Sequence, residues 1–314
     1  MSTLSLTLNA PLTVRLRAWA GERFPPANTV LALVVYLAAL LAGRALTSSG
    51  ELWLGVTDAV GFAGVWGYFL MLRVFDEHKD YHHDASNHPE RVLQRGLVSL
   101  DHLKAVGAVA IALQVASVLI VDGGSGPVAV RWAITMAWSL LMLKEFFVGE
   151  WLERHFVLYA ASHLLAMPLA LLWMAQMGAG DRPLPGSVLW LAAAGGLLGA
   201  AIEIARKVRA PEDERIGIAT YTKVLGIRGS VAAIGAVMAG LTVAIARLMD
   251  ALGIPTPAAL CAIGAALSAA LAAAVAFARR PTSAAASRVE AITGLAVLVQ
   301  LVSLVAALVA ERGI

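Results

Sequence analysis

Nine apolar runs of about 20 residues dominate this sequence and constrain its fold more than any other feature. Each run is long enough to cross a bilayer as an α-helix. Only 14% of the residues are charged, whereas a soluble domain averages about 25%. The sequence therefore predicts an all-α polytopic membrane protein. The expected spans are Thr29–Leu46, Leu52–Val74, Leu103–Val121, Pro127–Phe147, Phe156–Met177, Ser187–Ala205, Ser230–Leu252, Pro257–Phe277 and Ala291–Val309.

The segment before the first run is not typical of a signal peptide, because Arg15 and Arg17 follow its apolar residues instead of preceding them. We expect a short interfacial helix with Trp19 at the level of the lipid headgroups. The chain then divides into an N-terminal segment, residues 1–28, and a single membrane domain, residues 29–314. The single Cys261 lies in an apolar run, which excludes an intrachain disulfide.

The basic residues are distributed unevenly between the two sets of loops that the spans define. Nineteen of the 24 lysines and arginines fall in the set that includes the N-terminus, and five fall in the other set. By the positive-inside rule, the N-terminus and both strongly charged loops, Phe75–Leu100 and Arg206–Gly229, are cytoplasmic, and the C-terminus lies outside. The formal net charge of +3 is too small to indicate nucleic acid binding.

Small residues and a proline predict details of the packing. Gly195 and Gly199 in the sixth span, and Gly264 with Ser268 in the eighth, would let neighbouring helices approach closely. Pro168 would kink the fifth span. Four tryptophans near span ends are typical of an interfacial belt: Trp19, Trp53, Trp151 and Trp190.

The first charged loop begins with three aspartates that recur every fourth residue: Asp76, Asp80 and Asp84. On a helix each step of four residues advances the direction by only about 40°, so these carboxylates would share one face. Like charges at this spacing repel each other, and a bound cation would neutralise them. Hard oxygen ligands without a thiolate suit Mg²⁺, which leaves positions open for water and substrate phosphates. The alternative is a solvated helix end that Lys79 and the nearby histidines balance.

The residues that follow resemble those of a known family. Arg91-Val92-Leu93-Gln94-Arg95-Gly96 and Ser99 are similar to the RPLxxG…S that follows the NxxxDxxxD motif of the UbiA superfamily of intramembrane prenyltransferases. Asp76 stands at the Asn position, and Asp80 and Asp84 stand at the two Asp positions. Val92 replaces the usual Pro.

The second charged loop carries the other half of the resemblance. Gly217, Thr220 and Gly226 match the tail of the family's second aspartate-rich motif, and Asp213 matches its last Asp. Its earlier Asp positions hold Arg206 and Arg209, with Lys207 between them. These cations cannot ligate a metal, but they suit direct phosphate binding. The alternative is a juxtamembrane basic cluster that serves topology and lipid contact.

The resemblance implies nine helices around a central cavity and an Mg²⁺-dependent transfer of a prenyl group from an isoprenoid diphosphate to an acceptor that the sequence does not identify. Its metal ligands would be Asp76, Asp80, Asp84 and Asp213. The cations expected to bind the diphosphate are Arg91, Lys144, Arg206, Lys207 and Arg209. The alternative for Lys144 is a snorkelling lysine with a local acidic partner.

Of three other classes of membrane protein, one is compatible with the sequence. A UbiA-type terpene cyclase would use the same residues, and the sequence does not exclude it. A transporter with a carboxylate ion site is disfavoured, because the acids lie at span ends and no span carries an Asp, Glu or Lys at its middle. A CDP-alcohol phosphotransferase is disfavoured because the sequence lacks the DGxxAR core.

Overall fold

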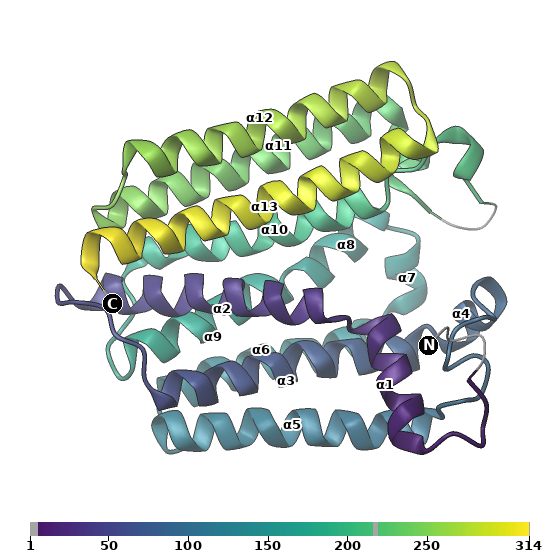
Figure 1. The fold of residues 1–314 in the computed structure, drawn as a ribbon, viewed down its shortest axis with the longest axis horizontal. Coiled ribbons are helices and arrows are strands. Elements are labelled where there is room, and N and C mark those ends of the chain that lie inside the picture. The colour runs from purple at the N-terminus through teal and green to yellow at the C-terminus, as the bar shows by residue number, and fades with distance from the viewer. Residues whose placement is uncertain (1–5, 216–218, 314) are drawn as a thin grey trace. The chain divides into compact units, whose positions relative to one another are not determined.

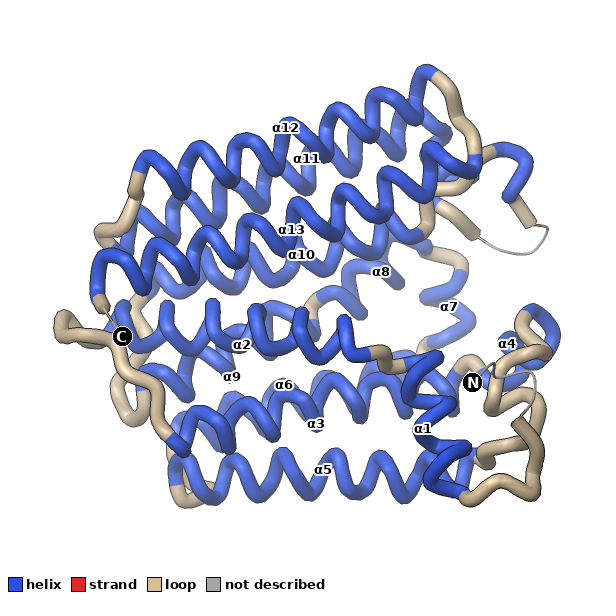
Figure 2. Tube along the Cα trace, in the orientation of Figure 1, coloured by secondary structure: helices blue, strands red, loops and turns tan. Residues whose placement is uncertain are grey.

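The computed structural model describes residues 6–215 and 219–313, without the side chain of Glu153. Throughout these residues the regular structure is helical and contains no strand (Figure 2). Eight of the described helical segments are long and apolar enough to cross a membrane. The helix Pro127–Leu143 is also apolar but shorter. The chain falls into two compact units.

The first unit comprises residues 1–36 and 55–155. Helices α3 and α5 lie side by side in it (Figure 1). Gly67 permits this approach, because a Cβ atom there would lie 2.7 Å from the carbonyl oxygen of Ala110. The described elements of this unit are α1 (Leu12–Arg23), the first half of α2 (Pro26–Thr47), α3 (Val56–Lys79), α4 (Tyr81–Asn87), α5 (Leu100–Asp122), α6 (Pro127–Leu143), η2 (Glu145–Phe147) and α7 (Gly149–Glu153).

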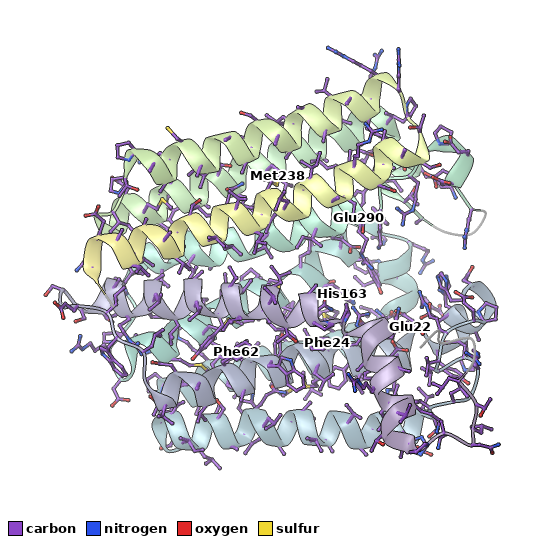
Figure 3. All side chains as sticks on the ribbon, viewed as in Figure 1. Glu22, Phe24, Phe62, His163, Met238 and Glu290 are labelled. Atoms are coloured by element: carbon purple, nitrogen blue, oxygen red, sulfur yellow. The ribbon has the colours of Figure 1, made fainter. Side chains whose placement is uncertain are left out.

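The second unit comprises residues 37–54 and 156–314. Helices α10 to α13 pack as a bundle (Figure 1), and Met238 on α11 is fully buried within it (Figure 3). The described elements are the second half of α2, α8 (Phe156–Leu164), α9 (Ala166–Ala179), η3 (Gly186–Val188), α10 (Leu189–Arg206), η4 (Pro211–Asp213), α11 (Tyr221–Leu252), α12 (Pro257–Arg279) and α13 (Ser283–Arg312).

Each expected span overlaps a described helix, although the bounds differ, most of all at the starts of α11 and α13, and two further spans differ in their course. The fourth was expected to reach Phe147, whereas α6 ends at Leu143. The fifth is divided into α8 and α9 at Leu165. Pro168 explains this break, because it has no N–H group to donate to the carbonyl of Leu164 one turn earlier.

The expected close contacts are confirmed for one pair of small residues and wrong for the other. Gly195 lies against Leu171 and Met167 of α9, with an ideal Cβ atom 3.0 Å from the nearest Leu171 carbon. Gly264 faces open space, since no heavy atom lies within 4 Å of its ideal Cβ position. The tightest helix contact of the second unit involves two glycines that the sequence did not single out. Gly43 on α2 and Gly178 on α9 each meet backbone atoms of the facing helix.

Of the four tryptophans predicted to lie in an interfacial belt, three are exposed and one is buried. Trp53, Trp151 and Trp190 are 41–55% exposed, as an interfacial belt requires. Trp19 was expected at headgroup level, but it is only 2% exposed. The Trp19 side chain is therefore packed inside the protein and does not contact lipid headgroups.

Candidate functional site

The three aspartates of the first motif stand at the junction of α3 and α4. Helix α3 ends before Asp80, whose φ of −92° and ψ of 6° depart from helical geometry. The four-residue hydrogen-bond pattern continues across this residue, because the amide of Asp80 donates to Asp76 and the amide of Asp84 donates to Asp80, both at 2.8 Å. The sequence predicted the three aspartates on one helix, whereas the structure distributes them over the end of α3, the junction and α4.

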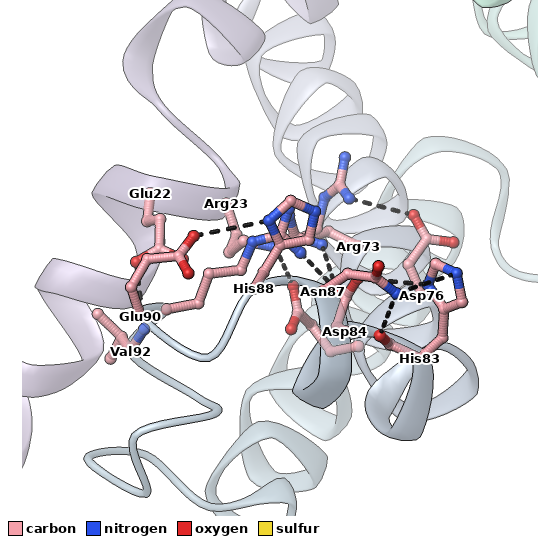
Figure 4. A network of polar contacts seen from close by, with 12 residues as sticks. Glu22, Arg23, Arg73, Asp76, His83, Asp84, Asn87, His88, Glu90 and Val92 are labelled. Carbon is pink, nitrogen blue, oxygen red and sulfur yellow. Dashed lines mark hydrogen bonds and ion pairs between the residues drawn. The ribbon is translucent and has the colours of Figure 1, made fainter. Parts of the chain in front are cut away.

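Asp76 and Asp80 are accessible. The side chain of Asp76 is 46% exposed, and its Oδ2 atom lies 3.3 Å from Nη1 of Arg73 (Figure 4). Asp80 is exposed, and within the described part of the chain its carboxylate has no hydrogen bond or ion pair. A ligand can therefore reach oxygen atoms of both carboxylates.

Asp84 has a different environment. Its side chain is only 12% exposed, and its Oδ2 atom accepts from Nη1 of Arg91 at 2.5 Å and lies 3.6 Å from Nη2 of Arg23. Arg23 also pairs with Glu77, which is 1% exposed on α3. Figure 4 shows this network joining α1, α4 and the segment that follows α4. Asp84 is a partner of two arginines and not an open ligand.

The segment after α4 is tied to the N-terminal part of the chain by further contacts. The amide of Val92 donates to Oε2 of Glu22 at 3.2 Å, and Nη1 of Arg15 donates to the carbonyl of Leu97 at 2.8 Å. Partial burial raises the pKa of Glu22, and the Val92 amide and Arg23 oppose this effect. Gly96 has a φ of +72°, which explains the glycine of the RPLxxG-like motif.

A second ion pair lies beside the motif. Nζ of Lys79, the last residue of α3, is 3.0 Å from Oε1 of Glu145. Glu145, Phe146 and Phe147 all have left-handed φ angles of 48–60°, a conformation that costs non-glycine residues roughly 1–3 kcal/mol each. Lys144 is exposed, and no described residue pairs with its side chain. Glu145, the neighbouring acid that could have paired with Lys144, forms its ion pair with Lys79 instead.

The cations of the second motif differ in how they are held. Oε2 of Glu203 accepts from Nη2 of Arg206, and its Oε1 atom lies by Nζ of Lys207, both at 2.6 Å. The guanidinium group of Arg209 donates to the carbonyl of Val208 at 3.2 Å and pairs with no carboxylate in the described residues. Among the three cations predicted to bind diphosphate in this loop, Arg206, Lys207 and Arg209, the charge of Arg209 is therefore the least compensated.

Two acids of the loop, Glu214 and Asp213, differ in their surroundings. Oε1 of Glu214 accepts from the hydroxyl groups of Thr220 and Thr222 at 2.6 and 2.7 Å. Thr220 also caps α11 by accepting from the amide of Lys223 at 3.1 Å. Asp213 is exposed, and its carboxylate has no partner among the described residues.

Glu212 connects this loop to α13, and Gly226 sets the backbone direction near the start of α11. Oε1 of Glu212 accepts from the amide of Ser283, the first residue of α13, at 3.1 Å. Its own backbone amide and this contact lower the pKa of Glu212. Gly226 interrupts α11 with a φ of +70°, so only a glycine fits this motif position without strain. Gly217 lies outside the described residues.

The donor set of the first motif fits a magnesium ion in part. Mg²⁺ is usually bound through one or two carboxylates, with water and substrate phosphates in its other positions. Asp76 and Asp80 are accessible hard donors one turn apart, whereas Asp84 is engaged by arginines. Across residues 6–215 and 219–313, no group of three or more His, Cys, Asp or Glu side chains is arranged to hold a metal ion.

The membrane-spanning helices and the two charged motifs define an intramembrane prenyltransferase. The chain belongs to the UbiA prenyltransferase family, whose family model matches residues 32–295. The resemblance seen in the sequence is thereby confirmed, and the protein is an integral, multi-pass membrane enzyme. None of the curated proteins matches the sequence.

Two solved structures share the fold. One comes from a study of digeranylgeranylglyceryl phosphate synthase in membranes; it has a TM-score of 0.67 and 15% identity, and the similarity covers 95% of this chain and 99% of that chain. The other is the apo structure of a UbiA homologue from Aeropyrum pernix K1, with a TM-score of 0.65, 17% identity, and coverage of 91% of this chain and 98% of that chain.

Sequence reasoning missed the residues that hold the first motif in place. Glu22, Arg23 and Glu77 form the network around Asp84 and Val92. The available signal was an adjacent acid and base at the end of an otherwise basic helix, together with an acid next to Asp76. These charges have a sequence pattern typical of a solvated surface, which is why they attracted no functional prediction.

Proposed function

We propose that this protein transfers the prenyl group of an isoprenoid diphosphate to an acceptor in the membrane, in a reaction that depends on Mg²⁺. Prenyl transfer is the reaction of the family, and the proposal adds the metal, the diphosphate and the residues that act on them. The observation that carries it is the contrast between Asp80, exposed and without a side-chain partner in the described residues, and Asp84, held by two arginines.

In this proposal Asp76 and Asp80 hold the metal. Their accessible carboxylates, one helical turn apart, leave the remaining coordination positions to water and diphosphate oxygens. Mg²⁺ bound there would stabilise the charge that develops on the diphosphate as the C–O bond breaks. Asp213, exposed in the second motif, is the additional ligand that the sequence predicts.

Asp84, which the sequence predicts as a third ligand, acts in this proposal as a positioning residue. Its ion pairs with Arg91 and Arg23 fix the segment after α4 against α1, and this fixes the direction of the helix end that carries Asp80. Arg91, predicted from the sequence to bind diphosphate, donates one guanidinium hydrogen bond to Asp84. Its other nitrogen atoms remain as donors to phosphate oxygens.

The cations of the second motif bind the anionic substrate. Arg209 has the least compensated charge, and a guanidinium group matches phosphate oxygens in a planar fork. Arg206 and Lys207 share Glu203, which orients both of them while reducing their net charge. Lys144 is exposed and contributes a further positive charge in the first unit.

The test is a product analysis with the purified full-length protein. Prenyl diphosphates of several chain lengths, carrying an isotopic label, are incubated with a panel of acceptors in either Mg²⁺ or EDTA, and products are resolved by mass spectrometry. We expect a prenylated acceptor in Mg²⁺ and none in EDTA. Equal product in EDTA would contradict the metal requirement, and a cyclised hydrocarbon formed without acceptor would identify a terpene cyclase.

A further inference from the structure

A groove with a volume of about 680 Å³ lies within the first unit, between α1 and the helices α2, α3 and α5. This volume is within the range of about 300–1,000 Å³ that is usual for small-molecule sites. The wall is almost entirely apolar and includes Trp19 and Gly21 from α1, Val30 from α2, Trp66 and Leu70 from α3, and Val106 from α5.

One charged side chain, Arg17 of α1, lines this groove. The other two arginines of α1 are engaged within the protein, since Arg15 donates to the carbonyl of Leu97 and Arg23 pairs with Glu77 and Asp84. Arg17 is exposed and has neither a hydrogen bond nor an ion pair with any described residue. The groove therefore combines an apolar wall with a single uncompensated positive charge.

We propose that this groove binds one anionic phospholipid, with an acyl chain against Trp66 and Leu70 and the headgroup phosphate at Arg17. Arginines next to a membrane surface attract anionic lipids. In phosphatidylglycerol the single phosphodiester charge has no cation in the headgroup and matches the one arginine, whereas in phosphatidylcholine the choline group already neutralises it. An isoprenoid diphosphate would share the apolar chain, but it carries denser charge and would call for more cations or a metal. The residues that line the groove include no carboxylate.

Lipid in the groove also stabilises α1 on the rest of its unit. The same helix carries Glu22 and Arg23, which contact Val92 and Asp84 of the first motif. Bound phospholipid therefore raises the temperature at which this unit unfolds. The binding itself stands independently of the proposed reaction, because Arg17 and the apolar wall take no part in it.

The experiment uses full-length protein, purified in neutral detergent and depleted of lipid, then exposed to equal amounts of phosphatidylglycerol and phosphatidylcholine. Native mass spectrometry measures which lipid stays bound. We expect the parent to retain phosphatidylglycerol preferentially, and Arg17→Gln to reduce this preference about fivefold, the contribution of one basic residue near an anionic headgroup. Arg17→Lys retains the preference, and Arg280→Gln, at an exposed arginine of another loop, leaves it unchanged.

A second variant tests the apolar wall. No heavy atom lies within 4 Å of an ideal Cβ on Gly21, so Gly21→Phe has room for its first side-chain atom and extends an aromatic ring at the groove. It should reduce the retention of both lipids and abolish the rise in unfolding temperature on adding phosphatidylglycerol. Retention like that of the parent in both Gly21→Phe and Arg17→Gln would overturn the proposal. A raised KM for prenyl diphosphate in lipid-free Arg17→Gln would overturn it too, by identifying the groove as a donor site.

Discussion

Nη1 of Arg91 lies 2.5 Å from Oδ2 of Asp84, seven residues earlier in the chain. The same carboxylate oxygen is 3.6 Å from Nη2 of Arg23 on α1. The third aspartate of the first motif is thus compensated inside the protein, whereas the second, Asp80, is exposed and has no side-chain partner in the described residues. Two aspartates four residues apart therefore differ in what their removal should do.

Asp80→Asn should lower kcat about 100-fold or more, the usual loss when one group that stabilises transition-state charge is removed. It should leave the unfolding temperature in detergent unchanged. Asp84→Asn should instead destabilise the fold by about 1.5–3 kcal/mol, because it weakens charge-assisted hydrogen bonds from Arg91 and Arg23. Activity and thermal unfolding of both variants provide the measurement. The division of roles is wrong if Asp80→Asn unfolds early and Asp84→Asn is as stable as the parent.

The sequence predicted the helices well because hydropathy directly reports burial in lipid. Their ends were harder. The pattern Lys144-Glu145-Phe146-Phe147 has no glycine or proline to indicate three left-handed residues, so α6 was expected to continue. In the candidate site, too, local sequence patterns indicated some features and missed those that depend on tertiary packing. The four-residue spacing predicted Asp76, Asp80 and Asp84 alike as metal ligands. The arginine partners that set Asp84 apart depend on the docking of α1, which no local pattern encodes.

Val92 occupies a position where the family usually has proline, and its amide donates to Glu22 at 3.2 Å. Proline has no N–H group, so Val92→Pro should cost about 1–3 kcal/mol of stability by leaving Glu22 without this donor. The cost should be smaller in a Glu22→Ala background, which a double-mutant cycle measures by thermal unfolding. Val92→Ala is the control, since it keeps the amide. Equal costs in both backgrounds would show that the hydrogen bond contributes nothing.

Glu212 links the second motif to the first turn of α13 and has a lowered pKa. A carboxyl whose pKa is lower in the folded state stabilises that state above the unfolded pKa, here about 4.5, and this contribution is lost as the pH falls through the folded value. Hydrogen exchange at the start of α13, corrected for intrinsic rates, should therefore accelerate as the pH falls from about 5 through the lowered pKa of Glu212. Glu212→Gln should remove the pH dependence. An unchanged profile in that variant would assign the effect to another group.

The distribution of basic residues predicts that the loop after α3 faces the cytoplasm. A single cysteine introduced by Ser86→Cys, in a Cys261→Ala background, tests this orientation, because Ser86 and Cys261 are both exposed in the structure. An impermeant thiol reagent should label it only after the cells are opened. Labelling of intact cells would reverse the assignment. Arg280→Cys, in a second loop predicted to be cytoplasmic, should behave in the same way.

Arg209 provides the most direct test of the second motif, where the family's carboxylate is replaced by a cation. Its guanidinium group pairs with no carboxylate in the described residues, whereas Arg206 is held by Glu203 at 2.6 Å. Removing a charge-assisted contact to phosphate costs about 1.5–3 kcal/mol, so Arg209→Ala should raise KM for the prenyl diphosphate roughly 10- to 100-fold.

The matched variants separate phosphate binding from a general effect of charge. Arg209→Lys should rescue KM only partly, because an ammonium group lacks the planar fork of guanidinium. Arg280→Ala removes an equal charge from another exposed loop and should leave KM unchanged. If the loop serves only topology and lipid contact, Arg209→Ala will insert, fold and turn over like the parent. Parent-like kinetics in both Arg206→Ala and Arg209→Ala would therefore rule out substrate binding by this cluster.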